Sequence, residues 1–176
     1  MRAKRSQHVF VRRAPKNRSE ARVALGHEVR RAALGRGGIR AVKREGDGAT
    51  PRGRFSVRQV FYRADRGPRP RTRLPVRAIR HHDGWCDDPA DGNYNRIVRL
   101  PARRSAEGLK RADPLYDLVL VLGYNDVPRV RGRGSAIFVH LARPGFTPTD
   151  GCIALSRRDL TMLLSRLGPR SAIVVG

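Results

Sequence analysis

Cysteine and long apolar runs are both scarce in this sequence. The 176 residues include two cysteines, Cys86 and Cys152, which are too few for a disulfide framework. No stretch approaches 18 consecutive apolar residues, so no transmembrane helix is predicted. The first thirty residues lack the apolar core of a signal peptide. These absences favour a cytoplasmic location, and a periplasmic or cell-wall location would need an export signal outside this sequence.

Acidic residues are also few: 15 Asp and Glu face 38 Lys and Arg, so the formal net charge is +23. A charge of this size raises the local concentration of anions. Nucleic acid, an anionic membrane surface and a carboxylate-rich substrate all remain open as partners, as does an arginine-rich surface without a partner. The cations are not interleaved with aromatic residues, as they are in single-strand binders. We therefore expect no specific nucleic-acid partner, and the composition leaves the oligomeric state open.

Hydrophobic residues make up 39% of the chain, which suffices for a globular domain. We expect one domain over residues 1–176, in which residues 1–20 could form a flexible basic N-terminus. Short apolar segments bounded by turn residues predict a mainly β fold. Strands are expected at residues 9–11, 21–25, 28–34, 55–62, 116–122, 135–141 and 173–175, with a hairpin turn at Gly26-His27 and a loop at 46–53.

Residues 64–114 form the longest irregular stretch and contain the single tryptophan. Such a long loop in a compact domain is usually functional. A short helix could occupy residues 105–111. We expect the stretch to wrap a face of the core, because it contains apolar residues that need burial: Ile79, Trp85, Ile97 and Val98.

The same stretch contains four residues with metal-ligating side chains: His81, His82, Asp83 and Cys86. They lack the Cys-x-x-Cys or His-x-x-x-His spacing of zinc sites, and adjacent side chains on an extended chain point apart. We therefore expect no metal site, and no other cofactor is indicated.

One helix is clearly predicted, over residues 157–167. Ser156 can cap its N-terminus, with Asp159 three residues later completing a pattern like a capping box. Gly168 and Pro169 end it. Its apolar residues share one face at helical spacing: Leu160, Leu163, Leu164 and Leu167.

Cys152 is the first candidate for chemistry. It follows Gly151 in a loop between a buried strand and the capped helix, and a nearby histidine or helix N-terminus favours the nucleophilic thiolate. Gly151 permits a sharp turn, so that successive N–H groups could stabilise an oxyanion. His140 ends the preceding strand, and the chain return can bring it close to Cys152. A buried structural cysteine and an unrelated histidine fit the same spacing.

Three segments in order resemble the L,D-transpeptidase (YkuD-like) family. Residues 135–140 (Ser-Ala-Ile-Phe-Val-His) and 149–154 (Thr-Asp-Gly-Cys-Ile-Ala) resemble the family signature of a strand-borne histidine followed by Gly-Cys. Residues 50–55 (Thr-Pro-Arg-Gly-Arg-Phe) resemble its Thr-Pro-x-Gly-x-Phe/Tyr element. The resemblance covers roughly residues 20–176, and the ordered set of segments is more specific than Gly-Cys alone.

The resemblance implies a β-rich α+β domain, a sandwich or barrel of the L,D-transpeptidase type. It implies Cys152 as nucleophile and His140 as base, with the Leu141 carbonyl orienting the imidazole and the N–H groups of Gly151 and Cys152 forming the oxyanion hole. The family acts on peptidoglycan stem peptides, at the bond between the L-centre of a diamino acid and a terminal D-residue. The acyl-enzyme is resolved by an amine, which cross-links, or by water, which makes the enzyme a carboxypeptidase.

This sequence departs from the family pattern at several positions. Asp150 stands where the family commonly has histidine, Ala154 where it has asparagine or arginine, and Leu141 where it has glycine or serine. Arg143 could replace the missing contact to a substrate carboxylate, and we place Thr149, Asp150 and Arg143 among the candidate substrate-binding residues. The alternative function is a basic nucleic-acid- or polyanion-binding protein with an incidental Cys–His pair.

Overall fold

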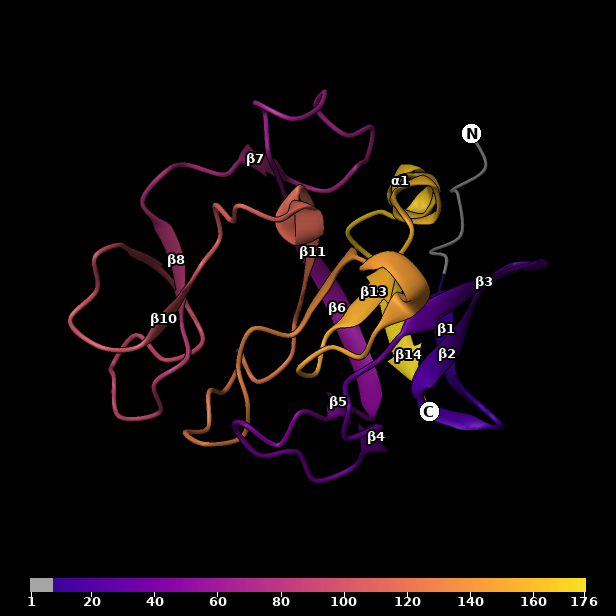
Figure 1. Cartoon of the computed structure of the whole chain (residues 1–176), viewed down its shortest axis with the longest axis horizontal. Coiled ribbons are helices and arrows are strands. Elements are labelled where there is room, and N and C mark those ends of the chain that lie inside the picture. Colours follow the sequence, from indigo (N-terminus) through magenta and orange to yellow (C-terminus); the bar gives the residue numbers. More distant parts are fainter. Residues whose placement is uncertain (1–7) are drawn as a thin grey trace.

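A computed structural model describes residues 8–176 (Figure 1). From residue 8 onward strands dominate, which confirms the mainly β fold. In chain order the elements are β1 (His8–Ala14), β2 (Asn17–Leu25), β3 (Glu28–Ala33), β4 (Ile39–Arg40), β5 (Thr50–Pro51), β6 (Gly53–Tyr62), β7 (Val76–Ala78), β8 (Asp83–Cys86), β9 (Ile97–Arg99), β10 (Ala106–Gly108), the 3₁₀ helix η1 (Pro114–Tyr116), β11 (Leu118–Leu122), β12 (Phe138–Leu141), the 3₁₀ helix η2 (Pro144–Phe146), β13 (Ile153–Leu155), α1 (Arg157–Arg166) and β14 (Ala172–Val175).

The main sheet has nine strands and is closed like a barrel. Its order is β11-β12-β13-β3-β2-β1-β14-β6-β7, and β11 also pairs with β6. Closure satisfies backbone groups that an open sheet would leave unpaired at its edges. The first core cluster consists mainly of aliphatic side chains from these strands and from α1. The sheet is therefore a rigid support for the loops at its ends.

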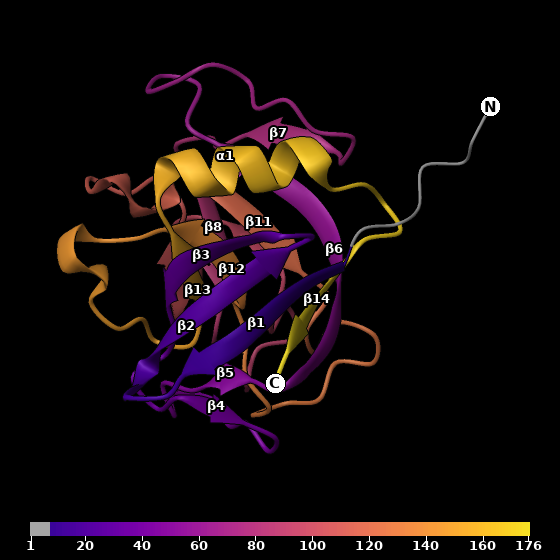
Figure 2. The ribbon, with the colours of Figure 1, turned by 90° about the vertical axis from the view of Figure 1, so that its right-hand side faces the viewer.

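The helix α1 forms as its sequence predicts. The Ser156 hydroxyl accepts a hydrogen bond from the Asp159 N–H at 3.1 Å and donates one to the Asp159 carboxylate. Leu160, Leu163 and Leu164 are buried against the barrel, and Figure 2 shows the helix lying across the strands. Within residues 8–176, no helix is long and apolar enough to span a membrane.

The stretch 64–114 is not structureless. It contributes β7 to the main sheet and forms a separate three-stranded sheet of order β10-β8-β9 (Figure 1). The helix considered for residues 105–111 is wrong, because Ala106–Gly108 pairs with β8 as a strand. Ile79 and Trp85 are buried as expected, but Ile97 is 38% exposed. The small sheet covers a second apolar cluster on the outer face of the barrel.

Several predicted strands differ at their ends. The strand expected at 135–141 begins at Phe138, because Ala136 adopts a left-handed conformation with φ of 51°. The strand expected at 116–122 begins at Leu118, because Pro114–Tyr116 forms η1. The Gly26-His27 hairpin is confirmed. Residues 8–20 lie in β1 and β2 or their turn and are not a flexible arm, whereas residues 1–7 lie outside the described residues.

Candidate active site

His140 lies in β12, and Cys152 lies immediately before β13, the parallel neighbour of β12. β13 runs parallel to β12, with Val139 opposite Ile153 and His140 opposite Ala154. Cys152 immediately precedes β13 and so lies beside Phe138. Residues two apart on a strand share a face of the sheet, which makes His140 and Cys152 diagonal neighbours on the same face. Sequence order alone left this juxtaposition open.

The Cys152 thiol is buried and neutral at rest. Its residue is 8% exposed. The sulfur donates a hydrogen bond to the Ala136 carbonyl at 3.2 Å and accepts one from the Phe138 N–H at 3.4 Å. Burial raises the pKa of the thiol to about 12, while the Phe138 N–H and the Lys43 ammonium act in the opposite direction. A thiolate at this position needs a base and positive charge to form.

The His140 imidazole is neutral and held in one orientation. Its Nδ1 lies 2.8 Å from the Leu141 carbonyl oxygen, so Nδ1 carries the hydrogen and Nε2 keeps a free lone pair. Burial lowers the pKa of His140 to about 4, and the positive charges of Arg111 and Arg143 act in the same direction. A neutral imidazole with a free Nε2 has the protonation state of a general base.

One cavity of about 450 Å³ brings these groups together. His140 and Cys152 both line it, as do Arg143, Thr149 and Asp150 among the residues singled out from the sequence. Gly151 and Leu141 position the residues that line the cavity. The Leu141 carbonyl holds the His140 ring, and Gly151 forms the turn that precedes Cys152. A cavity of this size takes a peptide-sized substrate group.

The loop 149–152, here called the nucleophile loop, is fixed by its own hydrogen bonds. The Thr149 hydroxyl donates to the Cys152 carbonyl at 2.7 Å and accepts from the Gly151 N–H at 3.2 Å. The Thr149 N–H donates to the Leu34 carbonyl, and the Thr149 carbonyl accepts from the Arg36 N–H. Gly151 has φ of 134°, and a Cβ there would lie 2.8 Å from the Ala49 carbonyl. The loop thus requires glycine at position 151.

Comparison with known protein families identifies the chain's family. The model of the L,D-transpeptidase catalytic domain (YkuD) matches residues 4–175, nearly the whole chain. The chain belongs to this L,D-transpeptidase family. The match supports peptidoglycan processing as its general function. No curated protein and no solved structure matched the chain.

Asp150 is a departure from the family pattern, and Arg143 was expected to replace a missing contact to the substrate. Both residues line the cavity of this L,D-transpeptidase domain, at its rim. The Asp150 side chain is 86% exposed and forms an ion pair with Arg36, whose side chain also lines the cavity. Arg143 is exposed and precedes η2. The Thr149 hydroxyl is engaged within the nucleophile loop, so its hydrogen bonds serve the loop, whereas Arg143 and Asp150 face solvent.

The sequence interpretation missed the opposite wall of the site. Tyr116, Glu107 and Arg111 line the cavity. The Tyr116 hydroxyl donates to Glu107 at 2.8 Å, and the Tyr116 ring lies edge-on to His140 with centroids 5.3 Å apart. Burial raises the pKa of Glu107. The sequence carried no signal that set Glu107 apart, because six other acidic residues lie in the stretch 64–114.

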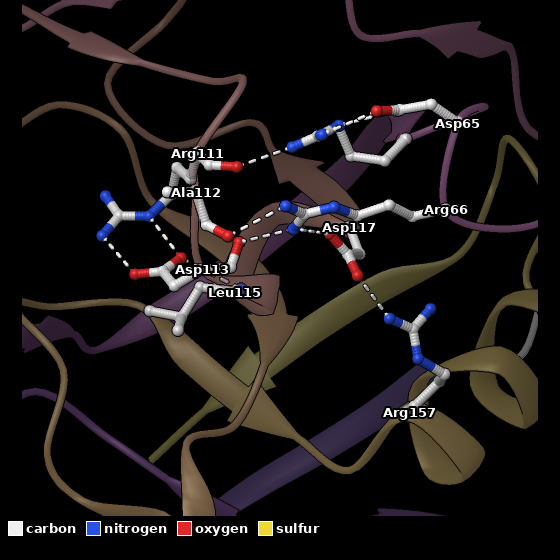
Figure 3. Close-up of polar contacts among 9 residues, drawn as sticks. Asp65, Arg66, Arg111, Ala112, Asp113, Leu115, Asp117 and Arg157 are labelled. Atoms are coloured by element: carbon white, nitrogen blue, oxygen red, sulfur yellow. Dashed lines mark hydrogen bonds and ion pairs between the residues drawn. The ribbon is translucent and has the colours of Figure 1, made fainter.

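Figure 3 shows how this wall is held in place. Asp113 binds the Arg111 guanidinium through two hydrogen bonds of 2.8 and 2.7 Å and caps η1 through the Leu115 N–H. The buried Asp117 carboxylate accepts from Arg66 at 3.0 Å and from Arg157 of α1 at 2.7 Å. These two-point contacts join the irregular stretch to the helix and fix the position of η1, and therefore of Tyr116.

Within residues 8–176, no group of three or more His, Cys, Asp or Glu side chains could hold a metal ion. Cys86 and Cys152 are both free thiols. The His81 and His82 rings meet edge-to-face, with centroids 4.8 Å apart, and belong to no such group.

Proposed function

We propose that this domain is a cysteine acyltransferase that cleaves the L–D bond of peptidoglycan stem tetrapeptides through an acyl-enzyme on Cys152. The observation that carries the proposal is the shared cavity, in which a neutral His140 with a free Nε2 lies on the same sheet face as the Cys152 thiol. A binding protein has no need for that arrangement.

The first half-reaction transfers the acyl group to the enzyme. His140 Nε2 takes the thiol proton, which ends the hydrogen bond to Ala136, and the sulfur attacks the carbonyl carbon of the diamino acid. We assign the backbone N–H of Cys152 as a donor to the oxyanion. The Gly151 N–H becomes a second donor once its hydrogen bond to the Thr149 hydroxyl breaks. The imidazolium then gives its proton to the departing amine of the D-residue, which leaves a thioester on Cys152.

The second half-reaction regenerates the thiol. His140 removes a proton from an incoming amine or water, whose nitrogen or oxygen attacks the thioester carbonyl, and the thiolate leaves and regains a proton. An amine acceptor gives a 3-3 cross-link, and water gives a tripeptide. Arg143 and Arg36 at the rim suit the terminal carboxylate of the donor peptide, because guanidinium groups bind carboxylates in a two-point geometry.

The test is incubation of the purified protein with muropeptide tetrapeptides, followed by mass spectrometry. A loss of the terminal D-residue, with water or a second stem peptide added in its place, is expected and also identifies the acceptor. Unchanged tetrapeptide with both single stems and stem mixtures would contradict the proposal. Cell fractionation then places the activity, since a carboxypeptidase acting on recycled muropeptides works in the cytoplasm and a cross-linking enzyme works on the exported wall.

The alternative, a basic polyanion-binding protein, is favoured by one observation, the net charge of +23. It predicts tight binding of DNA or RNA at physiological salt and no chemistry on tetrapeptides. It gives no reason for a buried cysteine and a neutral histidine to share a cavity, so we rank it second.

A further inference from the structure

Lys43 is a buried lysine beside the nucleophile loop. It lies in the segment that joins β4 to β5, and the residue is 4% exposed. A buried ammonium is costly unless it is paired, and a lysine of this kind is uncommon in a protein core. Apolar packing therefore does not account for its position.

Asp47 pairs with Lys43 but is also shared with the backbone. The Lys43 Nζ lies 2.8 Å from Asp47 Oδ1 and donates to the Arg44 carbonyl at 3.3 Å. The same carboxylate accepts the N–H groups of Arg44 at 2.8 Å and Ala49 at 2.9 Å. Because these backbone donors also draw on the negative charge of Asp47, the pair holds the ammonium in place without cancelling its field.

The Lys43 side chain passes Gly134 and ends behind Gly151. A Cβ added to Gly134 would lie 2.8 Å from Lys43 Cε, and one added to Gly151 would lie 3.5 Å from Nζ. Both glycines have positive φ, 103° and 134°. The ammonium therefore lies against the backbone of the residue that precedes the nucleophile, at a distance where no other side chain fits between them.

The proposed chemistry creates negative charge at this point. The thiol becomes a thiolate and then part of an oxyanion, in a buried site where charge is poorly solvated. Glu107, which lines the same cavity as Cys152, opposes the thiolate, whereas the Lys43 ammonium favours it. His140 accepts the proton, but its ring is also buried and neutral at rest. A fixed cation near Gly151 offsets part of this cost.

We propose that Lys43 is a positioning residue of the reaction, whose ammonium, held behind Gly151 by Asp47, stabilises the negative charge that develops on Cys152 and on the oxyanion that follows. The inference rests on the proposed role of Cys152 as nucleophile. It does not depend on the identity of the peptide substrate or of the acceptor.

The test measures alkylation of Cys152 by iodoacetamide, in which the thiolate displaces iodide and no peptide substrate is needed. Peptide mass spectrometry separates the Cys152 product from that of Cys86. Rates are compared between pH 6 and 10 for the wild type, Lys43→Met and the double variant Lys43→Met/Asp47→Asn. All rates are measured at one temperature, well below the lowest Tm of the series. Lys16→Met is the matched control, because Lys16 is exposed in the turn between β1 and β2 and its loss changes the net charge equally.

We expect alkylation of Cys152 to be about tenfold slower in both Lys43 variants throughout this range. Loss of a close positive charge raises the pKa of a thiol by about one or more, and the fraction of thiolate falls accordingly. Lys16→Met should react at the wild-type rate. The difference should persist in 1 M NaCl, since salt screens surface charges far more than buried ones.

The double variant separates a charge effect from a structural one. Lys43→Met alone leaves Asp47 without its buried partner and should lower the Tm, whereas the double variant removes both charges and should recover stability. A double variant that alkylates at the wild-type rate would overturn the inference and leave Lys43 a structural residue. Slow alkylation in the Lys43 variants, combined with a wild type that leaves tetrapeptides intact, would instead retain this inference and reject the proposed substrate.

Discussion

The Tyr116 ring lies edge-on to the His140 imidazole, with centroids 5.3 Å apart and an interplanar angle of 70°. Its hydroxyl donates to Glu107, so one side chain joins the base to a half-buried carboxylate of the same cavity. The ring limits the freedom of the imidazole, and the Leu141 carbonyl sets its tautomer. Histidine orientation is thus controlled from two sides, by Tyr116 of η1 and by Leu141 of the barrel strand β12.

That relationship predicts different outcomes for two changes at Tyr116. Tyr116→Phe keeps the edge contact with His140 but leaves Glu107 with one hydrogen bond fewer, and we expect kcat/KM to fall less than about tenfold. Tyr116→Ala removes the ring, so kcat/KM should fall about a hundredfold, with a loss of roughly 3–5 kcal/mol in the free energy of unfolding. Steady-state kinetics and urea denaturation of the two variants measure both effects. Equal activity in the two would contradict a role for the ring.

The nucleophile assignment predicts that Cys152→Ala lowers kcat/KM by at least about 10⁴-fold. The substitution removes one sulfur atom from a packed site, so the Tm should change by only a few degrees. Cys86→Ala is the control, because Cys86 is also buried but belongs to the small sheet. Tetrapeptide turnover followed by mass spectrometry checks both variants, and a fully active Cys152→Ala protein would rule out the mechanism.

The lowered pKa of His140 predicts that the protein loses stability in acid. Its pKa is about 4 in the folded protein, against an ordinary value of 6.5, so the unfolded chain binds the proton more readily between these values. Stability contributed by the neutral ring is present above about pH 6.5 and is lost as the pH falls toward 4, by about 3 kcal/mol. Urea denaturation at several pH values should show a shallower decline for His140→Gln. Carboxylates also titrate in this range, so the measured quantity is the difference between the two proteins, and parallel curves would contradict the prediction.

Gly151→Ala should lower the activity of the enzyme more than it lowers the stability of the fold. The new Cβ would lie 2.8 Å from the Ala49 carbonyl, at a φ of 134° that other residues rarely adopt, so the nucleophile loop must move. We expect kcat to fall about a hundredfold or more, because misplacement by about 1 Å is this costly. Gly132→Ala is the matched control, since Gly132 also has positive φ but has no atom within 4 Å of the added Cβ. A similar kcat in both variants would show that the loop tolerates the methyl group.

Salt distinguishes the two functional classes. Capture of a stem peptide involves few charges, so KM should rise only about threefold when NaCl is raised from 50 to 200 mM. A nucleic-acid binder that contacts six phosphates would lose about 10³-fold in affinity over the same increase. We expect weak DNA and RNA binding that disappears near physiological salt. Tight binding at 200 mM together with inactivity on tetrapeptides would favour the binding protein.

The sequence by itself determined the elements that local patterns encode. Alternating apolar residues predict the β2–β3 hairpin and β6, and the leucine spacing after Ser156 predicts α1 to within one residue. The ordered segments around residues 50–55, 140 and 152 identify the family before any geometry is known. Each of these signals is local, because strand and helix periods and turn residues act over a few neighbouring positions.

Only the tertiary structure decided what surrounds the candidate nucleophile. Tyr116 reaches His140, and Glu107 reaches the Tyr116 hydroxyl, because the small sheet and η1 fold back over the barrel. Lys43 reaches Gly151 from the segment between β4 and β5, where the sequence predicts no functional residue. No local period encodes these contacts. They join residues that are distant in the chain, and they form only when burial of the two apolar clusters brings separate segments against the same sheet.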